Sequence, residues 1–588
     1  MELKRIFDIP DHQKKNYPKR DALNAKENGQ WRAYSIDECI DNIDKVSFAL
    51  LASGIKKDDK ISIISNNRPE WNYVDFGAMQ TGAIIVPLYP TSTEEDYVFI
   101  FNDAEVKIVF VSSEELYQKV QNIKSRIPSL KEVFTFNQVK GAPHFSEFME
   151  RSKNGSVTEL EKIKSNITQE DVSTIIYTSG TTGFPKGVML THNNIMADVI
   201  AAKPLMPVGE KDKALSFLPL NHSFEKMISY LYLCYGISIY YAESMDTIGD
   251  NLREVKPQIM TCVPRLLEKV YEKILTKGQD LKGIKRALFF WALSLGERWD
   301  NQKSNGIFYN LQLAIANKLI FSKWREALGG ELKCVVTGAA PMQHKLLRIF
   351  TAAKITIMEG YGLTETSPAM TVSRFNLDEN VIGCVGPPLP GVEVKIAEDG
   401  EILCRGAIVM KGYYKRPDLT AEVIDKDGWL HTGDIGEFVN GKFLKITDRK
   451  KELFKTSGGK YVAPQPIENK FKEELLIEQM MVVGAYRKFP AALIVPAANN
   501  LKVWCTQHGI NFTNTSEMIN NEAVKKKFAQ LVEENNKLFG HSEQIKKFTL
   551  VPNEWTIADG ELTPTLKLKR KIIERKFEKE IEAMYAEN

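Results

Sequence analysis

The chain has 588 residues, of which 43% are hydrophobic and 26% are charged, and its formal net charge at pH 7 is +3. That length exceeds what one hydrophobic core organises, so we expect two or more domains of ordinary globular composition. The nearly balanced charge gives no support for nucleic acid as a partner.

The cysteines and the apolar runs argue against a zinc-binding, disulfide-rich, secreted or membrane-spanning protein. The seven cysteines are scattered without a Cys-x-x-Cys pair, which argues against a structural zinc site or a disulfide framework and favours a reducing compartment. The first ten residues lack the apolar core of a signal peptide, and the most apolar later run, Leu231 to Ala242, is shorter than the ~20 residues of a membrane-spanning helix. We expect a cytoplasmic protein and leave peripheral contact with a membrane open.

The first half of the chain alternates short β-branched runs with longer segments of helical spacing. Residues 60–67, 83–90, 106–113 and 172–180 have the composition of buried strands, and residues 35–55 have the periodicity of a helix. This alternation predicts an α/β domain with largely parallel sheets.

Three later segments differ in texture. Residues 264–329 are rich in Leu, Lys, Arg and Trp at helical spacing and predict a helical insertion. Residues 391–406 and 441–455 have the pattern of hairpins with turn residues between strands. From Lys451 onward, strands and charged helices alternate over a length that suits a small α+β domain.

The stretch YTSGTTGFPKGVMLTH, residues 177–192, combines hydroxyls, glycines and a lysine directly after an apolar run. Such a strand-to-turn segment suits a polyphosphate, but the Walker spacing is absent, because Pro185 and Val188 occupy the positions that would require glycine. The whole string resembles the phosphate-binding signature of the adenylate-forming superfamily, which includes acyl-CoA synthetases, firefly luciferase and the adenylation domains of peptide synthetases. The resemblance implies ATP-phosphate contacts from Thr178, Ser179, Gly180, Thr181, Thr182, Gly183 and Lys186, with Lys186 also acting in catalysis.

Two further stretches resemble motifs of the same superfamily, in the expected order. LPLNHSFEK, residues 218–226, resembles the segment that borders the acyl carboxylate, which implies that role for His222. VTGAAPM, residues 336–342, resembles the turn along the adenine and the opening of the acyl pocket. That turn consists of Gly338, Ala339 and Ala340.

MEGYGLTET, residues 358–366, begins like a dinucleotide-binding loop but has Glu365 where close backbone approach would require a small residue. A carboxylate beside a triphosphate suits Mg²⁺, which prefers oxygen ligands. The resemblance implies that Tyr361 stacks on adenine and that Glu365, with Thr178, holds the metal. The nucleotide contacts expected from this stretch are Glu359, Gly360, Tyr361, Gly362 and Thr364.

The later motifs concern the ribose, the hinge and CoA. GWLHTGDIG, residues 428–436, resembles the ribose motif with Asp434, and residues 446–468 resemble the hinge region, with Arg449 at the ribose and Lys451 at the hinge. Lys455 matches a lysine that the superfamily uses in the second half-reaction, in which the CoA thiol displaces AMP. The residues expected to contact CoA are Lys455, Ser457, Gly458 and Gly459.

One motif departs from the usual pattern. Superfamily members usually carry a Gly-Lys pair near the C-terminus whose lysine bridges carboxylate and phosphate, whereas this chain has GELTPTLKLKRK at residues 560–571, with Thr565 at the lysine position. Long-chain acyl-CoA synthetases resemble this Thr-Pro-Thr version. Lys567 and Lys569 are therefore the candidates for the adenylation lysine, and we favour Lys567.

The resemblance implies a long-chain fatty acid–CoA ligase that uses ATP, Mg²⁺ and, as its second substrate, coenzyme A. It implies an α/β fold: a large domain of α/β subdomains with an associated distorted β-barrel (1–447, helical insertion 264–329), a hinge (448–451) and a small mobile α+β domain (452–588). The alternatives are a CoA ligase for a medium-chain or aryl acid, a fatty acid–AMP ligase that delivers to a carrier protein, and a nucleotide-binding regulator without catalysis.

The helical insertion bears on the acyl substrate. It carries Leu288, Phe289, Trp291, Leu295 and Trp299 among basic residues. These side chains would line an acyl tunnel, lie on a membrane surface, or pack their apolar face against the main domain. The sequence does not decide among the three, nor does it indicate an oligomeric state.

Overall fold

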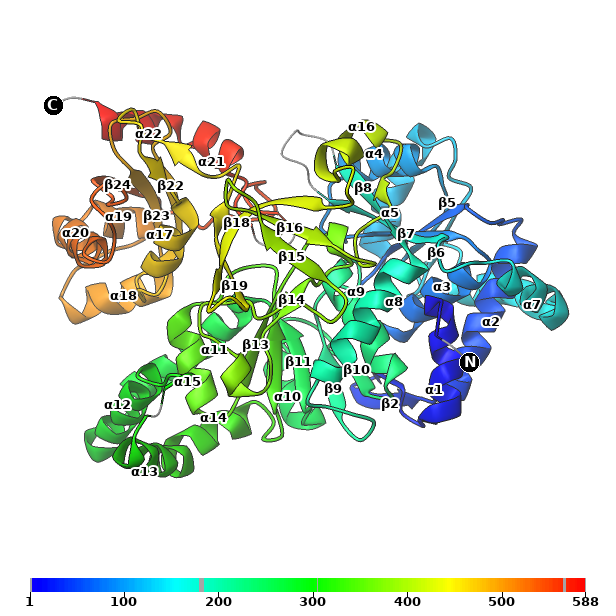
Figure 1. Cartoon of the computed structure of the whole chain (residues 1–588), viewed down its shortest axis with the longest axis horizontal. Helices are drawn as coiled ribbons and strands as arrows, with labels where there is room; N and C mark the ends of the chain where they lie inside the picture. The colour runs from blue at the N-terminus through cyan, green and yellow to red at the C-terminus, as the bar shows by residue number, and fades with distance from the viewer. Residues whose placement is uncertain (1–2, 179–184, 304, 564–566, 587–588) are drawn as a thin grey trace.

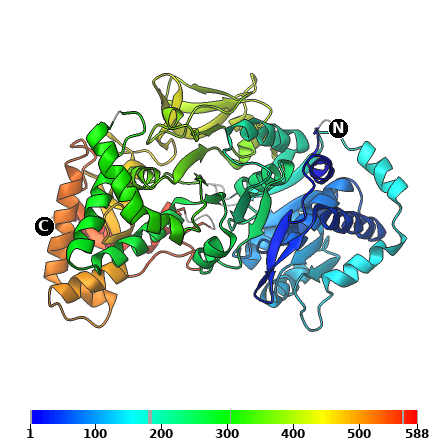
Figure 2. The ribbon, with the colours of Figure 1, turned by 90° about the horizontal axis from the view of Figure 1, so that it is seen from below.

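The computed structural model describes residues 3–178, 185–303, 305–563 and 567–586. Figure 1 shows a large domain and, at its left, a small domain that carries the C-terminus. Seen from below in Figure 2, the N-terminal α/β layers (blue to cyan) lie at one end of the molecule and the small domain (orange to red) at the other.

The first sheet has seven strands in the order β17-β8-β7-β4-β3-β5-β6. Strands β3 to β7 are parallel to their neighbours, whereas β8 runs antiparallel to β7 and to β17. The strands are β3 Lys60–Ile64, β4 Ile84–Leu88, β5 Val106–Val111, β6 Glu132–Thr135, β7 Val172–Thr178, β8 Lys186–Thr191 and β17 Gly412–Tyr413. The predicted buried strands correspond to β3, β4, β5 and β7.

Helices cover both faces of this sheet, because its strands are apolar on both sides. Ile61 and Ile63 pack with α2 and α3 on one face, and Ile64 packs with α4 and α5 on the other. The helices of this part are α1 Ile9–Asn16, α2 Ile36–Ala52, α3 Pro69–Gln80, α4 Glu94–Ala104, α5 Glu114–Ile123, α6 Phe145–Glu150 and α7 Val157–Ser165.

The second sheet has eight strands in the order β14-β13-β12-β11-β9-β10-β1-β2. The strands are β1 Leu23–Glu27, β2 Gln30–Tyr34, β9 Lys213–Ser216, β10 Ser238–Tyr241, β11 Ile259–Cys262, β12 Cys334–Thr337, β13 Thr356–Tyr361 and β14 Thr371–Val372. Its accompanying helices are α8 His192–Ala202, α9 Ser223–Cys234, α10 Ile248–Val255 and α15 His344–Ala352.

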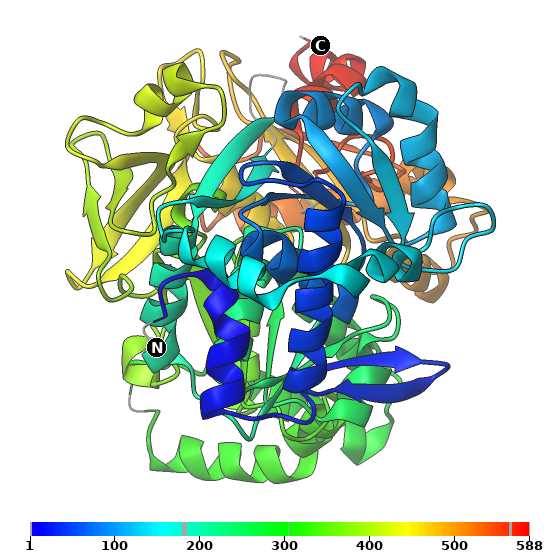
Figure 3. The ribbon, with the colours of Figure 1, turned by 90° about the vertical axis from the view of Figure 1, so that its right-hand side faces the viewer.

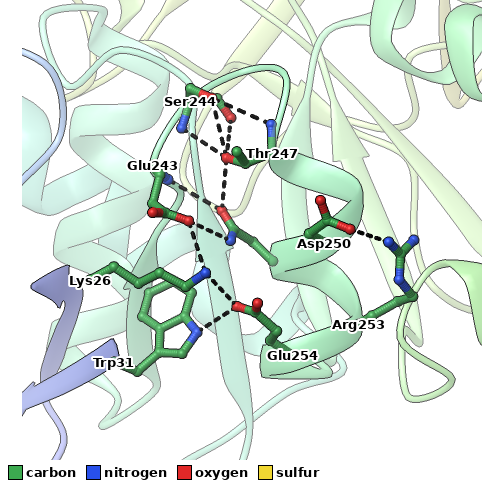
Figure 4. A network of polar contacts seen from close by, with 9 residues as sticks. Lys26, Trp31, Glu243, Ser244, Thr247, Asp250, Arg253 and Glu254 are labelled. Carbon is green, nitrogen blue, oxygen red and sulfur yellow. Dashed lines mark hydrogen bonds and ion pairs between the residues drawn. The ribbon is translucent and has the colours of Figure 1, made fainter. Parts of the chain in front are cut away.

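The N-terminal hairpin β1–β2 closes one edge of the second sheet and is fastened there by polar contacts (Figure 4). Lys26 Nζ lies 2.9 Å from Glu243 and 2.8 Å from Glu254, and Trp31 Nε1 donates a hydrogen bond to Glu254 at 2.9 Å. These contacts join the hairpin to β10 and α10, although about 200 residues separate the partners along the chain.

The predicted helical insertion consists of α11 Pro264–Gln279, α12 Gly283–Glu297, α13 Ile307–Ala316, a π-helical turn Asn317–Phe321 and α14 Ser322–Ala327. Phe289 and Leu295 are buried, and Trp291 and Trp299 are half-buried against the same core. The apolar face of α12 therefore packs onto the large domain, which is the third of the three alternatives for these side chains.

A third, antiparallel sheet follows in the order β15-β16-β18-β19. Its strands are β15 Glu393–Ile396, β16 Glu401–Arg405, β18 Leu430–Val439 and β19 Phe443–Arg449, and α16 Pro417–Val423 lies beside them. The sheet is open, so the expected distorted barrel has the form of a half-barrel.

The small domain is α+β with its own cores. Its elements are β20 Phe454–Lys455, β21 Tyr461–Val462, α17 Pro464–Phe471, β22 Ile477–Val483, β23 Ala491–Pro496, α18 Ala498–Gln507, α19 Thr515–Asn520, α20 Glu522–Asn536, β24 Lys547–Leu550, α21 Arg570–Lys576 and α22 Glu578–Tyr585. The expected fold class, a large α/β domain with a smaller α+β domain, is confirmed.

The cysteines and the hydropathy of the helices are features of the whole chain. All seven cysteines are buried and none is disulfide-bonded. In the part of the chain that the structure describes, no helix has both the length and the hydropathy needed to cross a membrane.

Candidate active site

The described residues of the phosphate-loop string belong to the neighbouring strands β7 and β8 of the first sheet and to the start of α8. Thr178 is the last residue of β7, Lys186 is the first residue of β8, and the two are register partners. Ser179, Gly180, Thr181, Thr182 and Gly183 lie outside the described residues. Burial lowers the pKa of Lys186, the Glu365 carboxylate opposes that shift, and the positive charge of Lys451 reinforces it.

Tyr413 joins Lys186 to Glu365. The Tyr413 hydroxyl donates a hydrogen bond to Glu365 Oε1 at 2.8 Å, and Lys186 Nζ lies 4.2 Å from the centroid of the Tyr413 ring. The motif reasoning missed Tyr413, because a Tyr-Tyr pair at the end of a short strand is not distinguishable from packing. The contact holds the Glu365 carboxylate beside the ammonium group of Lys186.

Asp434 sits at the centre of a second group. One of its oxygens accepts a hydrogen bond from the Tyr361 hydroxyl at 2.6 Å, and the other accepts one from Arg449 Nε at 2.9 Å. Asp434 on β18 and Arg449 on β19 are register partners, so the antiparallel pairing places them together. Burial, together with the Asp434 charge, raises the pKa of Tyr361, which keeps its hydroxyl a donor.

Glycines let the neighbouring turns approach closely. Glu359, Gly360 and Tyr361 end β13, and the segment Gly338–Ala340 follows β12, its parallel neighbour. A Cβ at Gly338 would lie 3.3 Å from the Gly360 carbonyl oxygen, and one at Gly362 would lie 1.8 Å from the carbonyl oxygen of Pro368. Any side chain at Gly362 would therefore displace the turn that carries Glu365.

His222 occupies the N-terminus of α9. Its Nδ1 accepts a hydrogen bond from the backbone of Phe224 at 3.2 Å, and the next residue, Ser223, lies 3.3 Å from Thr364, oxygen to oxygen. Burial, reinforced by the positive charge of Lys567, lowers the pKa of His222 to about 4. The imidazole is therefore neutral at pH 7, and because its Nδ1 accepts a hydrogen bond, its Nε2 carries the proton.

Lys567 brings the small domain into this site. The Lys567 side chain is exposed to solvent at its surface. Desolvation by nearby protein atoms and the positive charge of Arg449 lower its pKa. The carboxylates of Asp434, Glu452 and Glu365 act in the opposite direction. Lys569 donates a backbone hydrogen bond to Glu561 at 2.7 Å and accepts backbone bonds from Ile572 and Ile573 at 2.9 and 3.2 Å. The lysine on which the large-domain charges act is Lys567.

Arg570 anchors the segment that carries Lys567. Its guanidinium binds both oxygens of Glu468, at 2.8 and 2.7 Å, and Glu452 at 3.0 Å. Burial alone would lower the pKa of Arg570, but the two carboxylates raise it. The sequence reasoning missed this clamp, because an arginine inside the run KLKRK does not reveal which carboxylates it meets.

The remaining candidate residues lie at the hinge and in the small domain. Lys451 stands two residues after Arg449, and its charge reaches Lys186. Lys455 Nζ lies 4.6 Å from the centroid of the Tyr461 ring, and the Ser457 backbone donates to Arg487 at 2.8 Å. The described contacts of Lys455, Ser457, Gly458 and Gly459 are with other small-domain residues, away from the nucleotide group.

The donor set at Glu365 fits Mg²⁺. Among the described residues, no three His, Cys, Asp or Glu side chains gather as a protein-only metal site. Mg²⁺ needs no such cage, since it commonly takes one or two carboxylates and completes its shell with water and substrate phosphates. Glu365 keeps acceptor capacity beside its bond from Tyr413, and Thr178 ends the strand that leads into the phosphate loop.

Comparison with known proteins identifies the class. The family model for AMP-binding enzymes matches residues 10–414, and the model for the C-terminal domain of AMP-binding enzymes matches residues 452–588. The chain belongs to the AMP-binding enzyme family, and the resemblance to adenylate-forming enzymes is confirmed.

Within that family, the chain is similar to long-chain-fatty-acid–CoA ligases. It is 32% identical to FadD15 of Mycobacterium tuberculosis over 95% of this chain and 93% of that one. It is 34% identical to long-chain-fatty-acid–CoA ligase 1 of Homo sapiens, over 95% of this chain and 82% of the human protein.

Solved structures share the fold. The adenylation domain of a carboxylic acid reductase from Segniliparus rugosus, in complex with AMP, has a TM-score of 0.75 at 20% identity, over 100% of this chain and 94% of that one. O-succinylbenzoate CoA synthetase of Bacillus subtilis, with ATP and magnesium, has a TM-score of 0.68 at 19% identity, over 96% of this chain and 98% of that one.

Proposed function

We propose that the protein is a long-chain fatty acid–CoA ligase that converts a fatty acid, ATP and coenzyme A into acyl-CoA, AMP and pyrophosphate. The family and the relatives support this reaction. The observation that carries it is the large-domain group in which Asp434 accepts hydrogen bonds from Tyr361 and Arg449, with the small-domain Lys567 within electrostatic reach of Arg449 and Asp434.

The nucleotide roles follow this grouping. Lys186 and the loop after Thr178 bind the ATP phosphates, Tyr361 and the turn Gly338–Ala340 bind the adenine, and Asp434 with Arg449 binds the ribose. Glu365 and Thr178 would hold Mg²⁺, which lowers the negative charge of the triphosphate when bound. His222 lies at the acyl carboxylate.

In the first step, a carboxylate oxygen of the acid attacks the α-phosphorus of ATP and the bond to pyrophosphate breaks. Both reactants are negative, so the protein contributes mainly by holding them in line and offsetting their charge. Lys567 supplies a positive charge from the small domain, and neutral His222 adds no competing charge. Lys186 lies at the phosphates, where burial lowers its pKa and the Glu365 carboxylate opposes that shift.

In the second step, the CoA sulfur attacks the acyl carbonyl carbon, loses its proton, and AMP leaves with its oxygen. For this step we propose that Lys455 and the turn Ser457–Gly459 approach the adenylate after the small domain (452–588) rotates about a hinge at 448–451 relative to residues 1–447. The isolation of that turn from the nucleotide group in the present arrangement is consistent with such a rotation.

The length of the acyl chain is the finest part of the proposal. Each buried methylene contributes about 0.8 kcal/mol, so a pocket that fits a long chain discriminates strongly against acetate. The similarity to long-chain-fatty-acid–CoA ligases favours such a chain over an aryl or medium-chain acid.

Synthesis of acyl-CoA from ATP, Mg²⁺ and CoA, with palmitate, octanoate, benzoate and acetate offered separately, tests the proposal. We expect palmitoyl-CoA to form with the highest kcat/KM and AMP to appear in equal amount. Preference for octanoate or benzoate would change the assigned substrate to a medium-chain or aryl acid. Formation of adenylate without thioester would indicate delivery to a carrier protein. Absence of pyrophosphate release with every acid would contradict the enzyme assignment.

A further inference from the structure

One face of α13 is apolar and exposed. Ile307, Phe308 and Leu311 have exposed fractions of 87%, 86% and 61%, and Ile315 and Leu319 continue the row at 45% and 46%. Positions 307, 311, 315 and 319 recur every four residues, so they form one stripe along the helix and into the π turn. We call these five residues the α13 stripe.

The opposite face of the same helix is packed. Leu313 and Ala316 are buried in the core of the large domain, and the Tyr309 hydroxyl donates to the Leu295 carbonyl at 2.6 Å. These core contacts fix the orientation of α13. The stripe is therefore the outward face of a packed helix. Figure 1 places α13 at the outer lower edge of the large domain, and Figure 3 shows the green helical segment along that edge.

Cations are frequent in the segment that carries the stripe, and Arg298 lies over the Tyr309 ring of α13 at 5.7 Å from its centroid. The segment 281–323 contains seven Lys and Arg residues but only two carboxylates, Glu297 and Asp300. Glu297 pairs with Lys345 at 3.0 Å, and Asp300 lies 3.5 Å from Lys303 and 3.8 Å from Arg348. The exposed cations of the segment are Lys282, Lys285, Arg286, Arg298, Lys303, Lys318 and Lys323.

We propose that the α13 stripe and the exposed cations of the segment 281–323 dock the enzyme on the surface of an anionic phospholipid bilayer. The stripe would enter the boundary between headgroups and acyl chains, and the lysines and arginines would contact the lipid phosphates. A second copy of the chain fits less well, because a two-fold contact through this face would bring the same cations together. The proposal is independent of the ligase reaction.

Vesicle co-sedimentation tests the docking surface. We expect the protein to sediment with vesicles of equimolar phosphatidylglycerol and phosphatidylcholine, less with phosphatidylcholine alone, and less again at high salt. Phe308→Ser with Leu311→Ser should lower the partition coefficient by about tenfold or more. Lys282→Glu with Lys285→Glu should weaken binding to the anionic vesicles selectively.

Matched control variants distinguish this surface from nonspecific effects of exposed apolar side chains and of net charge. Val157→Ser with Leu538→Ser removes two apolar side chains exposed at 66% and 64% elsewhere, and Lys162→Glu with Lys211→Glu makes the same change of net charge. Both controls should bind vesicles like the wild type. Thermal unfolding of every variant shows whether it is folded.

Three results would overturn the proposal. The first is absence of wild-type binding to either vesicle, and the second is equal loss in the test and control variants. The third is a wild-type dimer in sedimentation equilibrium that Phe308→Ser with Leu311→Ser converts to a monomer without any vesicle binding, which would assign the face to a second copy.

Discussion

Asp75 and Lys226 form an ion pair buried in the large domain, and the Tyr230 hydroxyl donates to the same carboxylate. Both charged residues are at most 1% exposed. Removal of one partner leaves the other charge buried without compensation, which typically costs about 3–5 kcal/mol.

We therefore predict that Asp75→Ala lowers the free energy of unfolding by about 3–5 kcal/mol. Chemical denaturation of the two proteins measures the difference. A double variant, Asp75→Leu with Lys226→Met, should recover most of the loss because no charge remains buried; equal instability of the single and double variants would contradict this account.

Lys567 and Lys569 give a second prediction for single residues. Lys567→Ala should slow adenylate formation by about a hundredfold or more, since it removes a positive charge from the reacting phosphate, and should leave the thioester step nearly unchanged. The assays are palmitate-dependent exchange between ATP and pyrophosphate, and consumption of palmitoyl-adenylate by CoA.

Lys569→Ala is the matched control, because it removes a lysine of the same segment and keeps the backbone bonds that this residue makes to Glu561, Ile572 and Ile573. Its exchange rate should stay near that of the wild type. Loss of exchange in Lys569→Ala with retention in Lys567→Ala would reverse the assignment.

At the residue scale, the sequence motifs named candidate site residues but not the side chains that contact them. Asp434, Tyr361 and Arg449 could be named from the sequence, and the structure brings them into one group. Lys226, in the same motif as His222, is instead part of a buried ion pair, and Tyr413 was not anticipated. A linear pattern does not contain the distant partners, such as Asp75, that decide whether a side chain faces the core or the site.

At the scale of elements, the two domains touch through α11 and the loop before α15. Arg265 of α11 forms ion pairs with Glu478 of β22 and with Glu268 of its own helix, and Gln343 donates a hydrogen bond to the Lys472 carbonyl at 3.2 Å. These contacts stabilise the arrangement in which the charge of Lys567 reaches Arg449 and Asp434, which is the arrangement we propose for adenylation.

We predict that Arg265→Ala slows adenylate formation by about fivefold, corresponding to about 1 kcal/mol of interdomain contact, with little effect on the thioester step. Rapid quenching of a single turnover resolves the two steps. Arg126→Ala, which breaks the exposed ion pair with Glu95, serves as the control and should change neither rate. Equal slowing of both steps would indicate general destabilisation.

Element prediction succeeded where runs were long. The runs at 60–67 and 106–113 became β3 and β5, and the segment 264–329 is helical as expected. Strands β9 to β12 have four residues each, which is too few for a periodic signal, and the second half of the phosphate-loop string is strand β8 rather than loop. The sequence did not point to the exposed stripe of α13, because α12 and α13 are both apolar and only packing shows which one is covered.

At the scale of the whole molecule, buried carboxyls determine how stability depends on pH. Burial raises the pKa of Glu225 from 4.5 to about 7 and that of Asp448 from 3.8 to about 7. Since both pKa values are higher in the folded protein, the stabilising contribution is present below pH 4 and is lost as the pH rises toward 7. For Glu225 this corresponds to about 3 kcal/mol at pH 8 and above.

We predict that the melting temperature falls between pH 5.5 and pH 8.5. Glu225→Gln, which keeps the shape without the charge, should be more stable than the wild type at pH 8.5 and equal to it at pH 4.5. Calorimetry at several pH values measures both effects, and a wild-type melting temperature that rises over this range would contradict the assignment.

The burial of all seven cysteines has a practical consequence. A thiol reagent applied to the native chain can react only after local opening, so its rate reports breathing of the fold. Cysteines introduced at exposed Val157 of the large domain and Tyr486 of the small domain would react first, leaving the native thiols untouched. A dye pair at those two positions would report the proposed rotation of the small domain as a change in energy transfer during turnover.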